Sequence, residues 1–221
     1  MSIYDKASLV LIPSGTKTSK VYSQKPVNGD GDFTFSRSTA ATRVNADGNI
    51  EKETQNLLTY SNAFSSWGLN TGVSETSGQS GYDGSSDAWQ ISLTAAAGRL
   101  QESNTESGVQ TFSAYAKAGS LNWFRLFISA GSNVSAFFNL SSGVVGTTSN
   151  VIDTTIEAVS GATGWYKCSV TYNQTNASVR IYPATADNDL TATSGNIYIQ
   201  DAQLEQGLVA RDYIETTTAA V

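Results

Sequence analysis

The chain reads Val109-Gln-Thr-Phe-Ser-Ala-Tyr-Ala-Lys117, then Leu121-Asn-Trp-Phe-Arg-Leu-Phe-Ile-Ser129, then Val134-Ser-Ala-Phe-Phe-Asn-Leu140, and this stretch decides its fold class. Each run is rich in aromatic, β-branched and small residues, and Gly119 and Gly131 separate the runs. Such runs are typical of β-strands bounded by turns. The stretch therefore predicts three consecutive antiparallel strands.

Side chains on a strand alternate between its two faces, so each run divides into two sets. One set is apolar without exception, and we expect it to face a core. Its members are Phe112, Ala114, Ala116, Phe124, Leu126, Ile128, Val134, Ala136, Phe138 and Leu140. The other set mixes aromatic rings with hydrogen-bonding groups, which is typical of neither a core nor an ordinary polar surface. Its members are Thr111, Ser113, Tyr115, Lys117, Trp123, Arg125, Phe127, Ser135, Phe137 and Asn139.

Composition excludes several classes of function. The net charge is −6 and no Lys/Arg cluster occurs, which argues against binding to nucleic acid. The chain has no histidine, so Ser-His-Asp and Cys-His catalysis and His-based metal sites are excluded. No apolar run approaches the roughly 20 residues needed to span a bilayer, so we expect no membrane insertion. Cys168, the single cysteine, lies in an alternating run and is expected to be a small buried hydrophobe.

Paired carboxylates are the familiar catalytic route that remains without histidine. The acidic residues lie mostly in turns or at strand ends, and nothing in their spacing places two carboxyl groups together. We therefore predict that the protein is not an enzyme and has no cofactor.

Residues 1–54 differ from the rest of the chain. Short extended pieces alternate with Gly-, Asn- and Asp-rich turns, and apolar residues are too few for an independent core. We expect an extended docking arm, or a set of hairpins, that is completed by another surface. The residues expected to make that contact are Leu9, Leu11, Ile12, Phe33, Phe35, Arg37 and Arg43.

Residues 55–215 are expected to form the main domain. Besides the three central runs, alternating segments occur at residues 88–93, 154–159, 164–172, 178–183 and 196–205, and residues 212–215 close the domain. About eight or nine antiparallel strands at spacings of roughly ten residues, without a helix, predict an all-β jelly-roll sandwich. Residues 216–221 are expected to be a loose tail.

Several runs together resemble structural proteins of bacteriophage virions, of the head-fibre, decoration or tail type. Ser36-Arg-Ser-Thr-Ala-Ala-Thr-Arg-Val-Asn-Ala-Asp-Gly-Asn-Ile-Glu51 resembles the N-terminal segment of such chains. The runs that resemble the following jelly-roll module are Asn56-Leu-Leu-Thr-Tyr-Ser61, Thr111-Phe-Ser-Ala-Tyr-Ala-Lys-Ala-Gly119, Gly164-Trp-Tyr-Lys-Cys-Ser-Val-Thr171, Ala202-Gln-Leu-Glu-Gln-Gly207 and Asp212-Tyr-Ile-Glu-Thr216. That module is in turn similar to carbohydrate-binding modules of the β-sandwich kind.

The resemblance implies a non-enzymatic component of a phage particle, assembled in the host cytoplasm, with other virion proteins as partners. It also implies a homo-oligomer, with a trimer as the family expectation. Asp201 occupies a position where the similar sugar-binding modules place a structural calcium ligand, which implies calcium there.

The resemblance directs attention to the mixed aromatic and polar set. Sugars stack their C–H faces on aromatic rings, and their hydroxyl groups bind planar partners such as Arg and Asn. The candidate ligand or interface face consists of Tyr115, Lys117, Trp123, Arg125, Phe127, Phe137, Asn139, Arg180 and Tyr182. Three occupants remain open: the chain's own arm or a sister subunit, another virion protein, or host-surface glycan in an adhesion module.

Overall fold

The computed structural model describes residues 6–17, 20–26, 30, 33–34, 42–44, 50–52 and 55–220. The chain divides into two compact units, Met1–Glu53 and Thr54–Val221. No helix among the described residues is long and apolar enough to span a membrane.

The first unit contains short strands. β1 (Val10–Lys17), β2 (Lys20–Lys25) and β3 (Phe33–Thr34) form one antiparallel sheet, and β4 (Thr42–Val44) pairs with β5 (Ile50–Lys52). Of the residues expected in the docking arm, Leu11 and Ile12 belong to β1, Phe33 to β3 and Arg43 to β4. Leu9 is exposed, whereas Phe35 and Arg37 lie outside the described residues.

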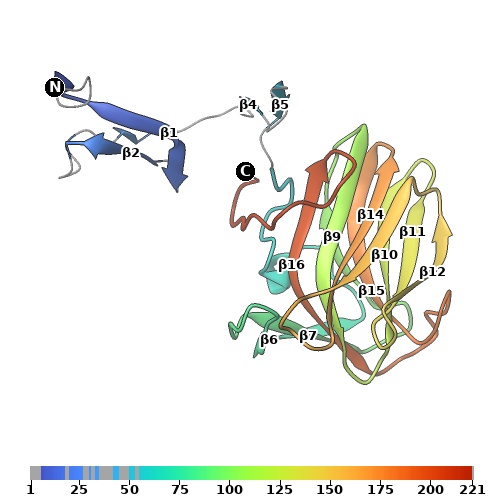
Figure 1. Ribbon diagram of the computed structural model, residues 1–221. Coiled ribbons are helices and arrows are strands. Elements are labelled where there is room, and N and C mark those ends of the chain that lie inside the picture. The colour runs from blue at the N-terminus through green and yellow to red at the C-terminus, as the bar shows by residue number, and fades with distance from the viewer. Residues whose placement is uncertain are drawn as a thin grey trace. The chain divides into compact units, whose positions relative to one another are not determined.

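The second unit is a sandwich of two antiparallel sheets (Figure 1). The six-stranded sheet has the order β13-β14-β9-β16-β7-β6 and the five-stranded sheet the order β12-β11-β10-β15-β8. The strands of the first are β6 (Val73–Gln79), β7 (Ala88–Leu93), β9 (Val109–Ala118), β13 (Asp153–Ala158), β14 (Trp165–Asn173) and β16 (Asn196–Gln206). Those of the second are β8 (Leu100–Ser103), β10 (Trp123–Ala130), β11 (Val134–Asn139), β12 (Val144–Ser149) and β15 (Asn176–Ala184). The one short 3-10 helix assigned in this unit is η1 (Phe64–Ser66).

The strand order is that of a jelly roll, as the sequence predicts. β7-β16-β9-β14 and β8-β15-β10-β11 form the two four-stranded halves, and β6, β12 and β13 add to their edges. Within residues 55–220 the sandwich has eleven strands rather than eight or nine. The sequence did not predict β6, which is polar, β8, which is short, or β12, which has no buried residue. Residues 212–215, expected to close the domain, form no strand, but Ile214 is hydrogen-bonded to Asn56 and Gln203.

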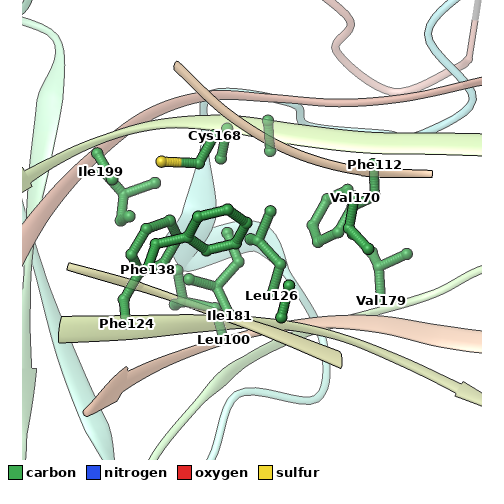
Figure 2. Packing of buried hydrophobic residues seen from close by; sticks show 14 of the residues in the cluster. Leu100, Phe112, Phe124, Leu126, Phe138, Cys168, Val170, Val179, Ile181 and Ile199 are labelled. Carbon is green, nitrogen blue, oxygen red and sulfur yellow. The ribbon is translucent and has the colours of Figure 1, made fainter. Parts of the chain in front are cut away.

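The core lies between the two sheets. All ten members of the apolar set are at most 2% exposed, which confirms the predicted alternation. Figure 2 shows Phe124 and Phe138 meeting Cys168 and Ile199 across the interior, and the two phenylalanine rings stack with centroids 5.3 Å apart. Cys168 is fully buried, as predicted, and burial raises the pKa of its thiol.

The three consecutive strands predicted over residues 109–140 are present, but they do not all lie in one sheet. β10 pairs with β11, but β9 pairs with β14 and β16 in the other sheet. The chain crosses between the sheets in the link 119–122, and the inward residues of β9 and β10 then meet across the core. The outward residues of β9 therefore lie on the opposite surface of the sandwich from those of β10.

Candidate functional site

The crossing divides the predicted ligand or interface face between the two sheets. Tyr115 and Lys117 belong to β9 and lie on the outer surface of the six-stranded sheet. The remaining seven belong to β10, β11 and β15 and lie on the outer surface of the five-stranded sheet. These are Trp123, Arg125, Phe127, Phe137, Asn139, Arg180 and Tyr182.

Strand register brings these outward side chains together. Arg125 in the central strand β10 lies opposite Phe137 of β11 and Tyr182 of β15, and Phe127 lies opposite Arg180. Side chains directly opposite on one face of an antiparallel pair are within contact distance. The register of β10 with β11 and β15 thus places two arginine side chains and several aromatic side chains next to one another on one surface.

Arg125 is held by aromatic rings. Its Cζ lies 4.1 Å from the ring centroid of Tyr182, 4.7 Å from that of Phe127 and 5.4 Å from that of Phe137. The Cζ of Arg180 lies 5.3 Å from the same Phe127 ring. A guanidinium group near an aromatic face is attracted by the ring quadrupole. We call the set Trp123, Arg125, Phe127, Phe137, Arg180 and Tyr182 the arginine–aromatic face.

The residues of this face differ in how far their side chains are buried. Phe137 is 2% exposed and Tyr182 5% exposed, so neither ring offers a stacking surface to a ligand. Trp123, Arg125, Phe127 and Arg180 are half-buried and keep part of their surface in solvent. Phe137, which the sequence suggested as part of the ligand or interface face, lies beside Arg125 and supports it.

The side-chain oxygen of Asn139 is engaged within its own turn. Its Oδ1 accepts hydrogen bonds from the backbone N–H groups of Ser141 and Ser142, at 2.9 and 3.2 Å, and from the Ser141 hydroxyl. This is the turn chemistry typical of asparagine. Asn139 therefore shapes the β11–β12 turn rather than presenting a free amide oxygen.

The edge strand β8 adds groups that the sequence did not single out. Gln101 lies opposite Arg180, and its Oε1 accepts a hydrogen bond of 2.7 Å from the Nε of Arg99. Alternation in the run Leu100-Gln-Glu-Ser103 could have indicated the outward position of Gln101, but the run was not recognised as a strand.

Tyr115 belongs to a second feature, on the six-stranded sheet. Its ring stacks on that of Tyr82, with centroids 3.8 Å apart and an interplanar angle of 9°. Together they line a cleft of about 460 Å³, which we call the tyrosine–aspartate cleft. The other residues that line it are Asn62, Asp83, Asp87, Asp201, Asp212, Tyr213 and Glu215.

Asp201 lies at the base of this cleft, on a β-bulge of β16. The register of β16 shifts between Gln200 and Gln203, and Asp201 has a φ of 53°. The Tyr82 hydroxyl donates a hydrogen bond of 2.8 Å to Asp201 Oδ2. Burial raises the pKa of the Asp201 carboxyl to about 7, and repulsion by nearby carboxylates acts in the same direction.

The other polar groups of the cleft mostly bind one another. Gln200 donates to Asp87 Oδ1 at 2.7 Å and accepts from the Tyr82 backbone N–H at 3.0 Å. In this way the loop that precedes β7 is attached to the bulge. Among the described residues no group of three or more acidic or sulfur side chains is close enough to hold a metal ion. The calcium predicted at Asp201 stays a prediction.

Residues 56–61, 202–207 and 212–216, three of the runs that resemble phage proteins, are joined by hydrogen bonds. We call this contact the seam. The buried amide of Asn56 donates to the carbonyl oxygens of Ala202 and Ile214, and its Oδ1 accepts from the backbone N–H groups of Leu58 and Leu204. The Thr216 hydroxyl donates to the Leu58 carbonyl oxygen at 2.6 Å. These runs therefore close the sandwich at this seam.

Known proteins give few points of comparison. No protein-family model matches the sequence, and no curated protein matches it. Among solved structures, the chain is similar to the CBM22-1–GH10 modules of endo-1,4-β-D-xylanase 10B from Clostridium thermocellum, complexed with xylohexaose. The identity is 14% and the TM-score 0.41, over 73% of this chain and 29% of the xylanase chain.

A second similar structure is the carbohydrate-binding module CBM6cm-2 of lichenase 5A from Cellvibrio mixtus, in complex with cellotriose. The identity is 12% and the TM-score 0.34, over 71% of this chain and 98% of the module. Both structures include β-sandwich carbohydrate-binding modules, and at these TM-scores neither assigns a ligand to this chain. The proposals that follow depend on the chain's own residues.

Proposed function

We propose that the protein is a non-catalytic carbohydrate-binding protein, whose jelly roll binds glycan on the arginine–aromatic face. One observation carries the proposal: Trp123 and Phe127 are half-buried aromatic rings on the outer side of β10, and the guanidinium groups of Arg125 and Arg180 lie beside the Phe127 ring. A pyranose ring needs a flat apolar surface for its C–H face and planar donors for its oxygens. This face supplies both.

The face is also rigid. Apart from Phe137 of β11, its residues project from β10 and β15, whose pairing extends without a shift from Trp123–Ala184 to Ser129–Ser178. Phe137 and Tyr182 support Arg125 from below, so its side chain is positioned before a ligand arrives. A preorganised site loses less conformational entropy on binding.

The absence of catalysis is part of the proposal. The chain has no histidine. Around the tyrosine–aspartate cleft, Asp83 and Asp87 accept hydrogen bonds from Gln200, and Asp201 accepts one from Tyr82. These contacts favour a structural role for the cleft.

A glycan array probed with the full chain tests this function, with Trp123→Ala and Tyr198→Ala as the variant and its control. Tyr198 is a half-buried aromatic residue on β16, in the opposite sheet. We expect saccharide binding by the wild type and by Tyr198→Ala, and a loss of at least about tenfold in Trp123→Ala with an unchanged melting temperature. Equal binding by all three proteins would place the site elsewhere.

We also propose a second function, as a structural component of a phage particle. Support comes from the resemblance of the sequence runs and from the separate compact unit Met1–Glu53. In this proposal the first unit attaches the protein to a neighbouring virion protein or to sister subunits. The two functions are compatible, because the jelly roll would then be displayed on the particle.

Light scattering of the full chain and of residues 55–221 tests the attachment. A trimeric full chain and a monomeric fragment would support assembly through the first unit. If both are monomers, self-association is not the function of that unit. Equal incorporation of the fragment and the full chain into particles would contradict the docking role altogether.

A further inference from the structure

We infer that the glycan bound on the arginine–aromatic face is anionic, a saccharide whose rings carry carboxylate or sulfate groups. This inference rests on the proposed function and names the class of its ligand.

The first observation is the distribution of charge. Residues 54–221 contain 6 of the chain's 13 Lys and Arg residues but 13 of its 19 Asp and Glu residues. Three of those six cationic residues are Arg99, Arg125 and Arg180, which lie on or beside the outer surface of the five-stranded sheet. An acidic domain thus carries half of its positive charge on one surface, where it attracts anions.

The second observation is the spacing of these groups. The guanidinium carbons of Arg125 and Arg180 lie 4.7 and 5.3 Å from the centroid of one ring, that of Phe127. The two carbons are therefore at most about 10 Å apart. Arg99 donates a hydrogen bond to Gln101, and Gln101 lies opposite Arg180. Two cationic groups thus lie beside one ring surface, which suits a chain of charged sugar rings.

The third observation concerns the partners of the three arginines. Arg180 donates to the hydroxyl groups of Ser178 and Tyr182, at 3.1 and 3.5 Å, and Arg99 donates to Gln101. The buried Nε of Arg125 has no hydrogen-bond partner. The hydrogen bonds that the structure records for these guanidinium groups thus go to neutral acceptors, so their charge remains available for a carboxylate or sulfate, which binds the planar fork in bidentate fashion.

An acidic polypeptide is the competing occupant, because arginine and aromatic residues are also enriched at protein interfaces. Strands β10 and β15 lack the aliphatic part of such an interface, although an exposed valine, Val144, lies opposite Asn139 on β12. The outward positions of β10 and β15 are Trp123, Arg125, Phe127, Ser129, Ser178, Arg180, Tyr182 and Ala184, with no Leu, Ile or Val. Polar groups between ring surfaces suit the hydroxyl groups of a saccharide better than apolar side chains.

Matched polysaccharides that differ only in charge test the inference. The full chain is titrated with polygalacturonate and its methyl-esterified form, with dextran sulfate and dextran, and with polyglutamate, after an array of neutral, uronic-acid and sulfated glycans has been screened. We expect at least one anionic saccharide to bind about tenfold or more tightly than its neutral partner. The binding should weaken as the salt concentration rises. The two pairs distinguish carboxylate from sulfate.

Variants locate the charge dependence. Arg125→Gln and Arg180→Gln should each weaken binding of the anionic saccharide by about tenfold. Arg125→Lys keeps the charge but loses the planar fork, and should show a smaller loss. Lys117→Gln removes the same charge from the opposite sheet and should bind as the wild type does. Melting temperatures of all variants establish that each is folded.

The possible outcomes distinguish this inference from the proposed function. Equal affinity for neutral and anionic glycans, still dependent on Trp123, overturns this inference and leaves the proposed function standing. No binding to any glycan on the array overturns both. If polyglutamate binds as tightly as the charged saccharides, the ligand of this face is an acidic polypeptide rather than a saccharide.

Discussion

Arg125 has an outward position in β10, yet three aromatic rings surround its guanidinium group. Alternation along the strand predicted that Phe127, Phe137 and Tyr182 point away from the core, and this is confirmed by the register. It did not predict that Phe137 and Tyr182 are buried there. Whether a side chain on an outer surface is buried depends on its neighbours in the adjacent strands. The sequence of one strand does not show which residues those neighbours are.

Asn56 gives a sharp test at the residue scale. Its buried amide makes four hydrogen bonds to the backbone of three segments, so Asn56→Ala leaves several buried groups without partners. We expect the free energy of unfolding to fall by about 2–4 kcal/mol, measured by urea denaturation. The control Asn122→Ala changes an exposed side chain and should stay within about 0.5 kcal/mol. Similar losses in both variants would contradict the role of the seam.

Asp201 predicts a pH dependence. The pKa of its carboxyl is about 7 in the folded protein, because of burial and then the charges of Asp83, Asp87 and Glu215. The unfolded value is about 3.9, so between pH 4 and 7 the folded state retains a proton that the unfolded state releases. The contribution of Asp201 to the free energy of unfolding therefore falls as the pH rises through this window.

The variant Asp201→Asn removes that titration and keeps a side chain that tolerates a φ of 53°. The free energy of unfolding of the variant should rise relative to the wild type by up to about 4 kcal/mol between pH 4 and pH 7. Denaturation curves at several pH values measure the difference. Parallel pH profiles for the two proteins would show that the pKa of the Asp201 carboxyl is not raised in the folded state.

At the scale of elements, the sequence predicted the main strands well where alternation is strong, as in β7, β14 and β16. It failed where the strand is polar or short, as in β6 and β8. It also could not assign β9 to a sheet, because Phe112, Ala114 and Ala116 would alternate identically in either sheet. Pairing is a non-local property, and that error placed Tyr115 and Lys117 on the wrong surface.

The β11–β12 turn provides a matched pair of glycines. Gly143 has a φ of +67°, and a Cβ there would lie 2.8 Å from the Tyr166 ring. Gly143→Ala should lower the free energy of unfolding by about 1–2 kcal/mol. In the β10–β11 turn, a Cβ on Gly131 meets nothing within 4 Å, and Gly131→Ala should be nearly neutral. Equal effects in the two variants, measured by thermal unfolding, would contradict this difference.

For the whole molecule, the sequence predicted a jelly roll after an N-terminal segment, and the structure has a separate unit at Met1–Glu53. Weak apolar content indicated that segment. The jelly roll followed from the number and spacing of alternating runs. The ligand face needed three strands from distant parts of the sequence, so its composition could be predicted only in part.

The jelly roll should fold without the first unit. All four tryptophans, Trp67, Trp89, Trp123 and Trp165, lie in residues 55–221, so their fluorescence reports on this unit alone. We expect the fragment 55–221 and the full chain to show one cooperative transition at melting temperatures within about 2 °C. A fragment that melts well below the full chain would show that the first unit stabilises the sandwich.

Glycan binding on the arginine–aromatic face is tested by following the four tryptophan indole N–H signals by NMR while an array-selected saccharide is added. Trp67 and Trp165 are buried, and the Trp89 Nε1–H donates to the Asn62 carbonyl oxygen, whereas Trp123 is half-buried on the arginine–aromatic face. The signal missing from Trp123→Phe assigns Trp123. We expect this signal to shift with saturation while the other three stay in place. A shift of Trp165, which lies beside Tyr82 of the tyrosine–aspartate cleft, with Trp123 unmoved would contradict it.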